Sequence, residues 1–151
     1  MSAIRTIRYM ELTEDDLDDS FIYVHDINQL LPQLAPAATP VTPEWLTEML
    51  KSGTRLFVAL DRDKVVGTVL LCTTLLLVGR KDWIEDVIVD RDYRGNGIAS
   101  KLMDMAEEAS RWQGAKSLNL TSKPERLAAR KMYENRGYVL RKTGVFQLKF
   151  Q

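Results

Sequence analysis

The segment RDYRGNGIAS, residues 91–100, places an arginine and two glycines directly after an apolar run, WIEDVIV, residues 83–89. Beyond the glycines the apolar period changes, because Ile98, Leu102 and Ala109 recur at the spacing of one helix face. A strand, a glycine loop and a helix within about thirty residues commonly form a pocket for an anion, since unpaired N–H groups at the helix start point at it. The residues therefore predict an anion site.

Three interpretations of the two glycines compete. A dinucleotide-binding loop requires G-x-G-x-x-G, but its third glycine position holds Ser100, and the loop lies late in the chain. A phosphate loop would require Gly-Lys-Ser/Thr, which is absent. On Gly95 and Gly97 alone, a tight turn without any ligand stays open, although both allow a close approach of the backbone and positive φ angles.

A longer pattern extends the loop. The arrangement Arg94-x-x-Gly97-x-Ala99 resembles the Arg/Gln-x-x-Gly-x-Gly/Ala signature of the GNAT superfamily of N-acetyltransferases. WIEDVIVD, residues 83–90, resembles the central strand of that family, and ARKMYENRGY, residues 129–138, resembles its Ala-x-x-x-Tyr-x-x-x-Gly-Phe/Tyr ending. The resemblance covers residues 54–150, whereas the first fifty residues match only in the order of their elements.

The resemblance implies that acetyl-CoA is a co-substrate. In the family the glycine loop holds the pyrophosphate of coenzyme A, and backbone groups of the central strand hold the pantetheine arm and polarise the thioester carbonyl. A backbone donor at the developing oxyanion contributes about 3–4 kcal/mol where water is excluded. The implied cofactor-binding residues are Val87, Ile88, Val89, Arg94, Gly95, Asn96, Gly97, Ile98, Ala99 and Arg126.

The resemblance also implies direct attack of an amine on the thioester, with no covalent enzyme intermediate. Tyr133 is the candidate general acid, because it matches the tyrosine of the ending motif. A leaving thiolate has a pKa of about 8.5 and a free tyrosine about 10, so full proton transfer is uphill by about 2 kcal/mol. Tyr133 is therefore expected to act as much by hydrogen bonding as by transfer, and packing beneath the closing strands is the alternative.

The candidate general base is Glu85, since family members often use a carboxylate at this position directly or through water. Simple alternation along the strand predicts that Glu85 and Asp86 lie on opposite faces. A lysine-like amine costs about 4.6 kcal/mol to deprotonate at pH 7, whereas an α-amine costs only about 1. Substrate binding, or pairing with an arginine, remains equally open for either carboxylate.

One position departs from the family pattern. Many members carry an asparagine three residues before the helix alanine, where this chain has Arg126. A guanidinium group cannot accept hydrogen bonds, so the usual contact with the pantetheine arm is in doubt.

Composition limits the other possibilities. The chain has 151 residues, Lys+Arg 21 and Asp+Glu 21, which predicts one domain spanning residues 1–151 with no nucleic-acid or membrane-surface partner. Cys72 is the single cysteine and His25 the single histidine, so no disulfide and no metal site is expected. The N-terminus lacks the apolar core of a secretion signal, which predicts a cytoplasmic protein. The apolar run at 65–78 is shorter than the ~20 residues that span a bilayer, so we expect one buried strand or two strands joined by a bend.

The resemblance implies a mixed α/β (α+β) domain of the GNAT-like acyl-CoA N-acyltransferase fold. We expect a mostly antiparallel central sheet of about six or seven strands with about four helices. For the first half of the chain, periodicity and turn residues predict a strand at 4–9, a helix from Thr13 to about Leu34, a proline-rich loop at 32–43, a helix from Pro43 to Lys51, and strands at 54–60 and from 65. For the second half they predict a turn at 79–82, a strand at 83–89 and, after the glycine loop, a helix to about Trp112. A strand at 115–121, a helix from Pro124 to Gly137 and one or two strands at 138–150 follow.

The sequence thus predicts an acetyl-CoA-dependent N-acetyltransferase that acts on a primary amine. A CoA-binding regulatory module without turnover is the alternative, and a dinucleotide-dependent redox enzyme is a third hypothesis. The amine acceptor stays open among small amines, amino acids, aminoglycosides and protein N-termini. A homodimer is possible, because residues 145–150 can pair as strands across two copies.

Overall fold

The computed structural model describes residues 5–17 and 21–150. Contacts between residues divide the chain into two units, residues 1–120 and residues 121–151. Each unit has its own architecture, and the expectation of a single domain stays a prediction.

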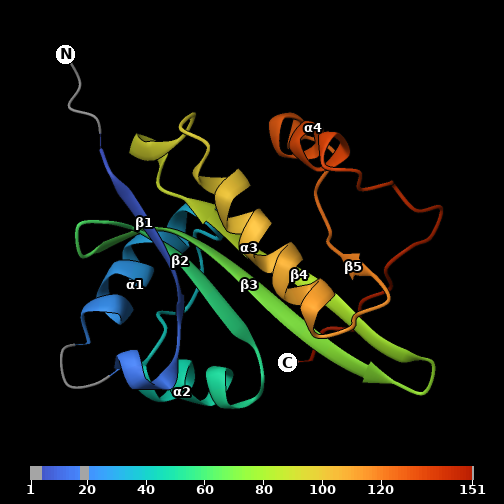
Figure 1. The fold of residues 1–151 in the computed structure, drawn as a ribbon, viewed down its shortest axis with the longest axis horizontal. Coiled ribbons are helices and arrows are strands. Elements are labelled where there is room, and N and C mark those ends of the chain that lie inside the picture. The colour runs from blue at the N-terminus through green and yellow to red at the C-terminus, as the bar shows by residue number, and fades with distance from the viewer. Residues whose placement is uncertain (1–4, 18–20, 151) are drawn as a thin grey trace. The chain divides into compact units, whose positions relative to one another are not determined.

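The first unit consists of a mostly antiparallel sheet with helices on both of its faces. In chain order its elements are β1 (Ile7–Leu12), the short 3-10 helix η1 (Glu14–Leu17), α1 (Ile22–Leu34), α2 (Pro43–Lys51), β2 (Arg55–Asp61), β3 (Lys64–Leu76), β4 (Gly79–Val89), the 3-10 helix η2 (Arg91–Tyr93), α3 (Ile98–Trp112) and β5 (Leu118–Asn119). The strand order is β1-β2-β3-β4-β5 (Figure 1). The pairs β1–β2, β2–β3 and β3–β4 are antiparallel, and β5 runs parallel to β4.

The described sheet has five strands, so the prediction of six or seven is wrong. The difference lies in residues 138–150, which form no strand in the described chain. Their alternating apolar side chains stay exposed, among them Phe146, Leu148 and Phe150. Alternation makes a segment suitable for a strand, but a strand also needs a partner edge, and the sequence does not specify one.

Helix α2 forms as its capping residues predict. The Thr42 hydroxyl accepts a hydrogen bond from the N–H of Trp45 at 3.1 Å, and Pro43 occupies the first helical position. The helix ends at Lys51, before Gly53, whose φ of 90° is left-handed.

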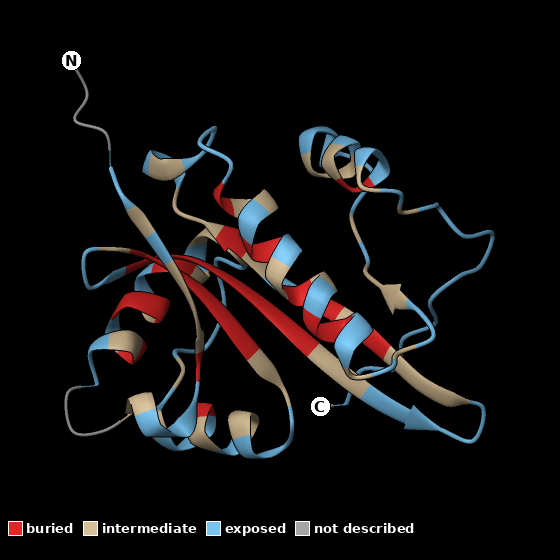
Figure 2. Cartoon of the chain, in the orientation of Figure 1, coloured by how far each residue is buried: buried red, intermediate tan, exposed pale blue. Residues whose placement is uncertain are grey.

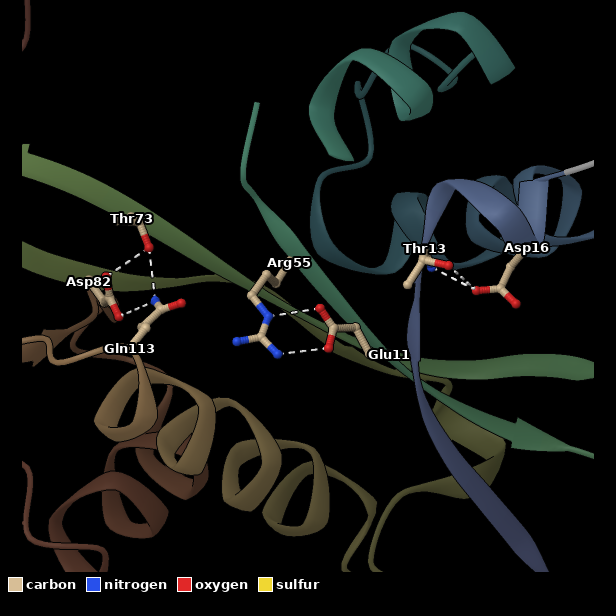
Figure 3. A network of polar contacts seen from close by, with 7 residues as sticks. All are labelled: Glu11, Thr13, Asp16, Arg55, Thr73, Asp82 and Gln113. Carbon is tan, nitrogen blue, oxygen red and sulfur yellow. Dashed lines mark hydrogen bonds and ion pairs between the residues drawn. The ribbon is translucent and has the colours of Figure 1, made fainter. Parts of the chain in front are cut away.

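The predicted helix from Thr13 begins later than expected. The N–H and hydroxyl of Thr13 both donate to the Asp16 carboxylate, at 2.7 and 2.9 Å (Figure 3). This pair closes only the 3-10 turn η1, and α1 starts at Ile22 and ends at Leu34 as predicted. The first strand is likewise shifted, to Ile7–Leu12, and Ile4 lies outside the described residues.

The β3–β4 hairpin decides between two alternatives for one segment and corrects the expected position of a turn. The apolar run at 65–78 forms one strand, β3, up to Leu76. Leu76 pairs with Gly79, so the turn consists of Leu77 and Val78, and the predicted turn at 79–82 belongs to β4. Within the described residues, no helix is long and apolar enough to cross a membrane.

The core lies between the sheet and the helices. Residues of α1 and α2 pack on one face of the sheet, and α3 packs on the other (Figure 1). Buried residues run along the centres of β2, β3 and β4 and along the inner sides of the helices (Figure 2). The core on the α1 face consists of Leu12, Val24, Ile27, Leu30, Leu46, Leu56, Val58, Leu60, Val65, Leu70 and Ile88.

Close packing fixes the start of α3 against β3. A Cβ atom on Gly67 would lie 3.1 Å from Ile98 Cγ2 and 3.2 Å from Leu102 Cδ1. It would also lie 3.3 Å from the backbone oxygen of Ile88, which cannot move aside as a side chain can. The missing side chain at Gly67 thus lets the first turn of α3 lie directly on the sheet.

A buried carboxylate fixes the end of α3 (Figure 3). Asp82, in β4, is 0% exposed and accepts hydrogen bonds from Thr73 Oγ1 at 2.9 Å, Ser110 Oγ at 2.7 Å and Gln113 Nε2 at 2.6 Å. Its backbone oxygen accepts from Asn119 Nδ2 at 3.1 Å. This residue therefore joins β3, β4, β5 and the last turn of α3.

The second unit contains α4 (Leu127–Asn135). The helix begins three residues later than predicted, because Pro124 and Glu125 form a turn and Arg126 is the N-terminal cap. It ends before Gly137 as expected.

The substitution Asp82→Asn is expected to lower the free energy of unfolding by about 2–3 kcal/mol, because the new amide N–H₂ would face buried donors. Urea denaturation at pH 7 measures the change. Asp63→Asn is the matched control, since the Asp63 side chain is 89% exposed and its ion pair with Arg8 is a surface contact. We expect a change within about 0.5 kcal/mol there, and equal losses in the two variants would contradict the role of Asp82.

Candidate active site

The glycine loop has the backbone conformation of an anion site. Gly95 and Gly97 have φ angles of 78° and 75°, a region that favours glycine. Gly97 is the N-cap of α3 and supplies no side-chain cap. Among the described residues, the N–H groups from Gly95 to Ala99 find no protein acceptor. These unpaired donors lie at the positive end of the helix dipole, where an anion is stabilised.

Two side chains of the loop hold its conformation by donating hydrogen bonds to backbone oxygens. Asn96 Nδ2 donates to the backbone oxygens of Tyr93 and Arg94, at 2.9 and 3.2 Å. Arg94 Nε donates to the backbone oxygen of Val89 at 2.9 Å. This bond ties the guanidinium group to the end of β4 and leaves its terminal nitrogens as donors for an anion.

Strand β4 presents an open edge just before the loop. The β4–β5 ladder holds only two pairs, Asp82 with Leu118 and Trp83 with Asn119, and no described strand pairs with this edge beyond them. The N–H of Asp90 bonds to the β3 residue Val66 at 2.9 Å. Because backbone groups alternate sides along a strand, those of Val89 point to the open edge.

The same alternation separates the three predicted strand residues. The backbone groups of Val87 share the open edge with those of Val89, whereas those of Ile88 point toward β3. The Ile88 side chain is buried in the core on the α1 face. Ligand contacts by the backbone are therefore available from Val87 and Val89.

A β-bulge interrupts β4 at Asp86. Glu85 pairs with Leu70 and Ile88 with Thr68, so two residues of β4 oppose one of β3. Asp86 has a φ of 47°, and its backbone oxygen accepts a hydrogen bond from Thr68 Oγ1 at 2.9 Å. Glu85 and Ile88 consequently face the same side although they are three residues apart. The simple alternation that we assumed for this strand fails beyond Glu85.

The two carboxyl groups at the bulge have elevated pKa values. Burial raises the pKa of Glu85, and the negative charge of Asp86 raises it further. Burial also raises the pKa of Asp86, although both residues keep exposed surface. Neither forms an ion pair with a described residue. A raised pKa makes the ionised form of Glu85 a stronger base than an ordinary glutamate.

Within the second unit, contacts at the C-terminal end of α4 hold Tyr133 in place. Its backbone oxygen accepts from the N–H of Tyr138 at 3.0 Å, and Gly137 bonds to Glu134 at 3.0 Å, the pattern of a Schellman motif. The rings of Tyr133 and Tyr138 meet edge to face at 5.9 Å. Burial raises the pKa of the Tyr133 phenol, and the charge of Arg126 opposes that rise.

The structure thus groups most of the predicted residues in the first unit. Glu85, Val87 and Val89 lie in the last five residues of the strand β4, before the loop of residues 94–99. Tyr133 and Arg126 belong to the second unit.

Residues that hold the loop were missed by the sequence reasoning. They are Asp61, Gln33 and Val66, which contact residues 90–93 from more than twenty positions away. No local pattern in the sequence marks these partners. The one signal is Tyr93, directly before Arg94, whose hydroxyl needs a hydrogen-bond partner.

A groove of about 440 Å³ lies elsewhere in the first unit, between β2 and α3. Its lining includes none of the predicted site residues and consists of Arg55, Phe57, Met105, Glu108, Ala109, Trp112 and Gln113. The described residues contain no cluster of three or more His, Cys, Asp or Glu side chains suited to a metal ion.

A sheet whose fourth strand ends in an uncapped glycine loop, with a fifth strand that pairs only briefly, defines an acyl-CoA N-acyltransferase fold. Residues 13–138 match the sequence profile of the acetyltransferase (GNAT) family. Because this match spans most of the chain, the protein belongs to the GNAT acetyltransferase family.

The match to an individual relative covers less of the chain than the match to the family does. The chain is 32% identical over 84 residues to N-alpha-acetyltransferase 30 of Schizosaccharomyces pombe. The matched segment makes up 54% of this chain and 55% of that protein. It therefore spans about half the length of this curated relative.

Three solved structures share the fold. An aminoglycoside acetyltransferase from an uncultured soil metagenomic sample superposes with a TM-score of 0.81, at 19% identity, over 96% of this chain and 97% of that chain. An acetyltransferase of Trypanosoma brucei gives 0.78 at 23% identity, over 96% and 100%. The ribosomal-protein-alanine N-acetyltransferase of Brucella melitensis gives 0.73 at 20%, over 97% and 100%. At these identities the likeness concerns the fold alone.

Proposed function

We propose that this protein transfers the acetyl group of acetyl-CoA directly to a primary amine. One observation carries the proposal: the uncapped start of α3, with Gly97 in the left-handed region and five unpaired N–H groups, directly follows the open edge of β4. Membership of the GNAT family supports the same activity.

The glycine loop would bind the pyrophosphate of CoA. The N–H groups from Gly95 to Ala99 donate to its oxygens, and the terminal nitrogens of Arg94 add positive charge. Space above the loop is free, because a Cβ atom on Gly95 or Gly97 would have no neighbour within 4 Å.

The open edge of β4 would bind the arm that ends in the thioester. Val87 and Val89 can pair with its amides as a neighbouring strand would. A backbone N–H from this edge, directed at the thioester oxygen, stabilises the oxyanion that develops when the amine attacks, by about 3–4 kcal/mol. The Val89 oxygen is already bonded to Arg94, so its N–H is the group left for the ligand.

Glu85 would accept the proton of the attacking amine, directly or through water. Its raised pKa shortens the gap between the carboxylate and an amine and so favours proton transfer. The gap is smallest for an α-amine, which costs about 1 kcal/mol to deprotonate at pH 7. The names of two structures reported above give different acceptors, an aminoglycoside and a ribosomal-protein alanine. The acceptor proposed here is a primary amine without further specification.

Tyr133 would donate a hydrogen bond, and in part its proton, to the leaving thiolate. Its raised pKa keeps the phenol protonated at physiological pH, which is the form that donates. Arg126 is proposed to bind CoA by donating hydrogen bonds, since it has no acceptor. The exposed residues 145–150 are proposed to pair with a second copy.

Gly97→Glu is expected to abolish micromolar binding of CoA and acetyl-CoA, because its carboxylate would occupy the anion site. Isothermal titration calorimetry with CoA, acetyl-CoA and NAD measures the affinities. Gly114→Glu is the matched control, since Gly114 has a φ of 77° with no neighbour within 4 Å and lies at the other end of α3. Binding retained by Gly114→Glu alone supports the proposal. A folded wild type that binds no CoA refutes it, whereas CoA binding without amine turnover favours the regulatory module.

Glu85→Gln is expected to change the acid limb of the pH–rate profile. As the pH falls through the raised pKa of Glu85, the carboxylate is protonated and cannot take the proton of the ammonium group, so log kcat/KM, level at higher pH, falls with a slope of about one. The variant lacks this base and uses only the neutral fraction of the amine, so its log kcat/KM should fall with a slope of about one from the pKa of the amine downward. Asp86→Asn should retain the level region but shift its lower end to lower pH, because the Asp86 charge helps to raise the pKa of Glu85. An identical profile for wild type and Glu85→Gln would exclude Glu85 as the base.

Tyr133→Phe is expected to lower kcat by about 10²-fold, while the affinity for acetyl-CoA stays within about twofold. Steady-state kinetics by thiol release and calorimetry give the two values. Tyr9→Phe, a half-buried tyrosine of β1, is the control and should leave both values unchanged. Unaltered kcat in Tyr133→Phe would leave the tyrosine with a packing role.

A further inference from the structure

The chain that enters the glycine loop is tied to three separate elements. The N–H of Asp90 bonds to the backbone oxygen of Val66 in β3 at 2.9 Å. The N–H of Arg91 bonds to Gln33 Oε1 of α1 at 3.0 Å. The short helix η2 is thus held on both the sheet and the helix layer of the first unit.

Tyr93 makes the third tie, from the last residue of η2. Its hydroxyl donates to Asp61 Oδ2 at 2.7 Å, across 32 residues of sequence. Asp61 ends β2, where it pairs with Ile7 of β1 and Lys64 of β3, so the acceptor has a paired strand on either side.

The ring of Tyr93 is fixed as well. The Arg5 guanidinium carbon lies 4.4 Å from the ring centroid, in cation–π contact. The hydrogen bond to Asp61 is the largest cause of a raised Tyr93 pKa, so the hydroxyl keeps its proton and the bond persists at physiological pH.

We propose that Tyr93 is a positioning residue that pre-forms the anion site: its bond to Asp61 holds the glycine loop in the conformation that binds the pyrophosphate. This inference rests on the proposed function, because the ligand is the pyrophosphate of CoA.

Conformational entropy gives the reason for such a tie. Gly95 and Gly97 have the most backbone freedom of the loop residues, so ordering them costs more conformational entropy than ordering other residues would. The backbone oxygen of Tyr93 is also the acceptor for Asn96 Nδ2, so a displaced Tyr93 would release the inner bond of the loop. When only a fraction of molecules has the competent loop, the apparent dissociation constant rises in inverse proportion to that fraction.

Tyr93→Phe tests the proposal, because it removes the hydroxyl and keeps the ring over which Arg5 lies. We expect the dissociation constant of acetyl-CoA to rise about tenfold, with kcat at saturating acetyl-CoA within about twofold. Asp61→Ala should have the same effect as Tyr93→Phe, and the double variant should be no worse than either, since both remove one bond. Asp61→Asn should retain near-normal affinity, because its amide oxygen can still accept the bond.

A second measurement separates this inference from the proposed function. Backbone ¹⁵N order parameters of Gly95 and Gly97, recorded without ligand, should fall in Tyr93→Phe relative to wild type and to the control Tyr9→Phe. Unchanged order parameters would overturn the inference, whether or not CoA binds. Wild-type protein that binds no CoA would refute the proposed function, and the order parameters would still decide whether Tyr93 holds the loop. Unchanged affinity in Tyr93→Phe, with wild type binding normally, would overturn the inference alone.

Discussion

The hydrogen bonds to the buried Asp82 carboxylate hold the C-terminal end of α3, the helix whose N-terminus follows the glycine loop. A carboxylate out of contact with water is costly unless its oxygens are bonded, and here Thr73, Ser110 and Gln113 satisfy them. Two of these donors lie in or just beyond the last turn of α3. Gly67 admits the first turn of the same helix against β3. With both ends fixed, α3 cannot slide along its axis, and its N-terminal N–H groups stay at the end of β4.

Asp82 also marks the place where β5 leaves β4. The ladder consists of Asp82 with Leu118 and Trp83 with Asn119 and does not continue. Three residues after Trp83, the bulge at Asp86 increases the local twist of β4, which turns the strand away from a straight neighbour. An edge strand with unpaired groups is normally a liability for aggregation. Here the open edge is short and ends in the glycine loop, which suits an extended ligand better than another chain.

How much of this arrangement could be predicted depends on the distance between partners in the sequence. The loop pattern from Arg94 to Ala99 and the caps of α2 are local, and the sequence alone predicted them. Asp82 reads as an ordinary turn residue, because its partners Ser110 and Gln113 follow 28 and 31 positions later. The bulge leaves no composition signal either, since it depends on how β4 registers with β3. Alternation at 145–150 predicted strands that the described chain does not form, because the pattern contains no information about a partner edge.

Arg126 changes the proposed role of Tyr133 as an acid, because a neutral asparagine at this position would not affect the pKa of the tyrosine. In place of the usual asparagine it brings a positive charge near Tyr133, seven residues along the chain, and a cation favours the phenolate over the phenol. Burial acts in the opposite direction and is the larger effect. A phenol with a pKa near 10 is already about 2 kcal/mol short of full transfer to a thiolate of pKa near 8.5, and burial alone would widen that gap. The positive charge of Arg126 acts to lower the pKa of Tyr133 and so narrows this gap between the phenol and the thiolate. In the proposed mechanism, the residue that weakens the expected contact with the pantetheine arm would therefore make Tyr133 a stronger hydrogen-bond donor to the leaving sulfur.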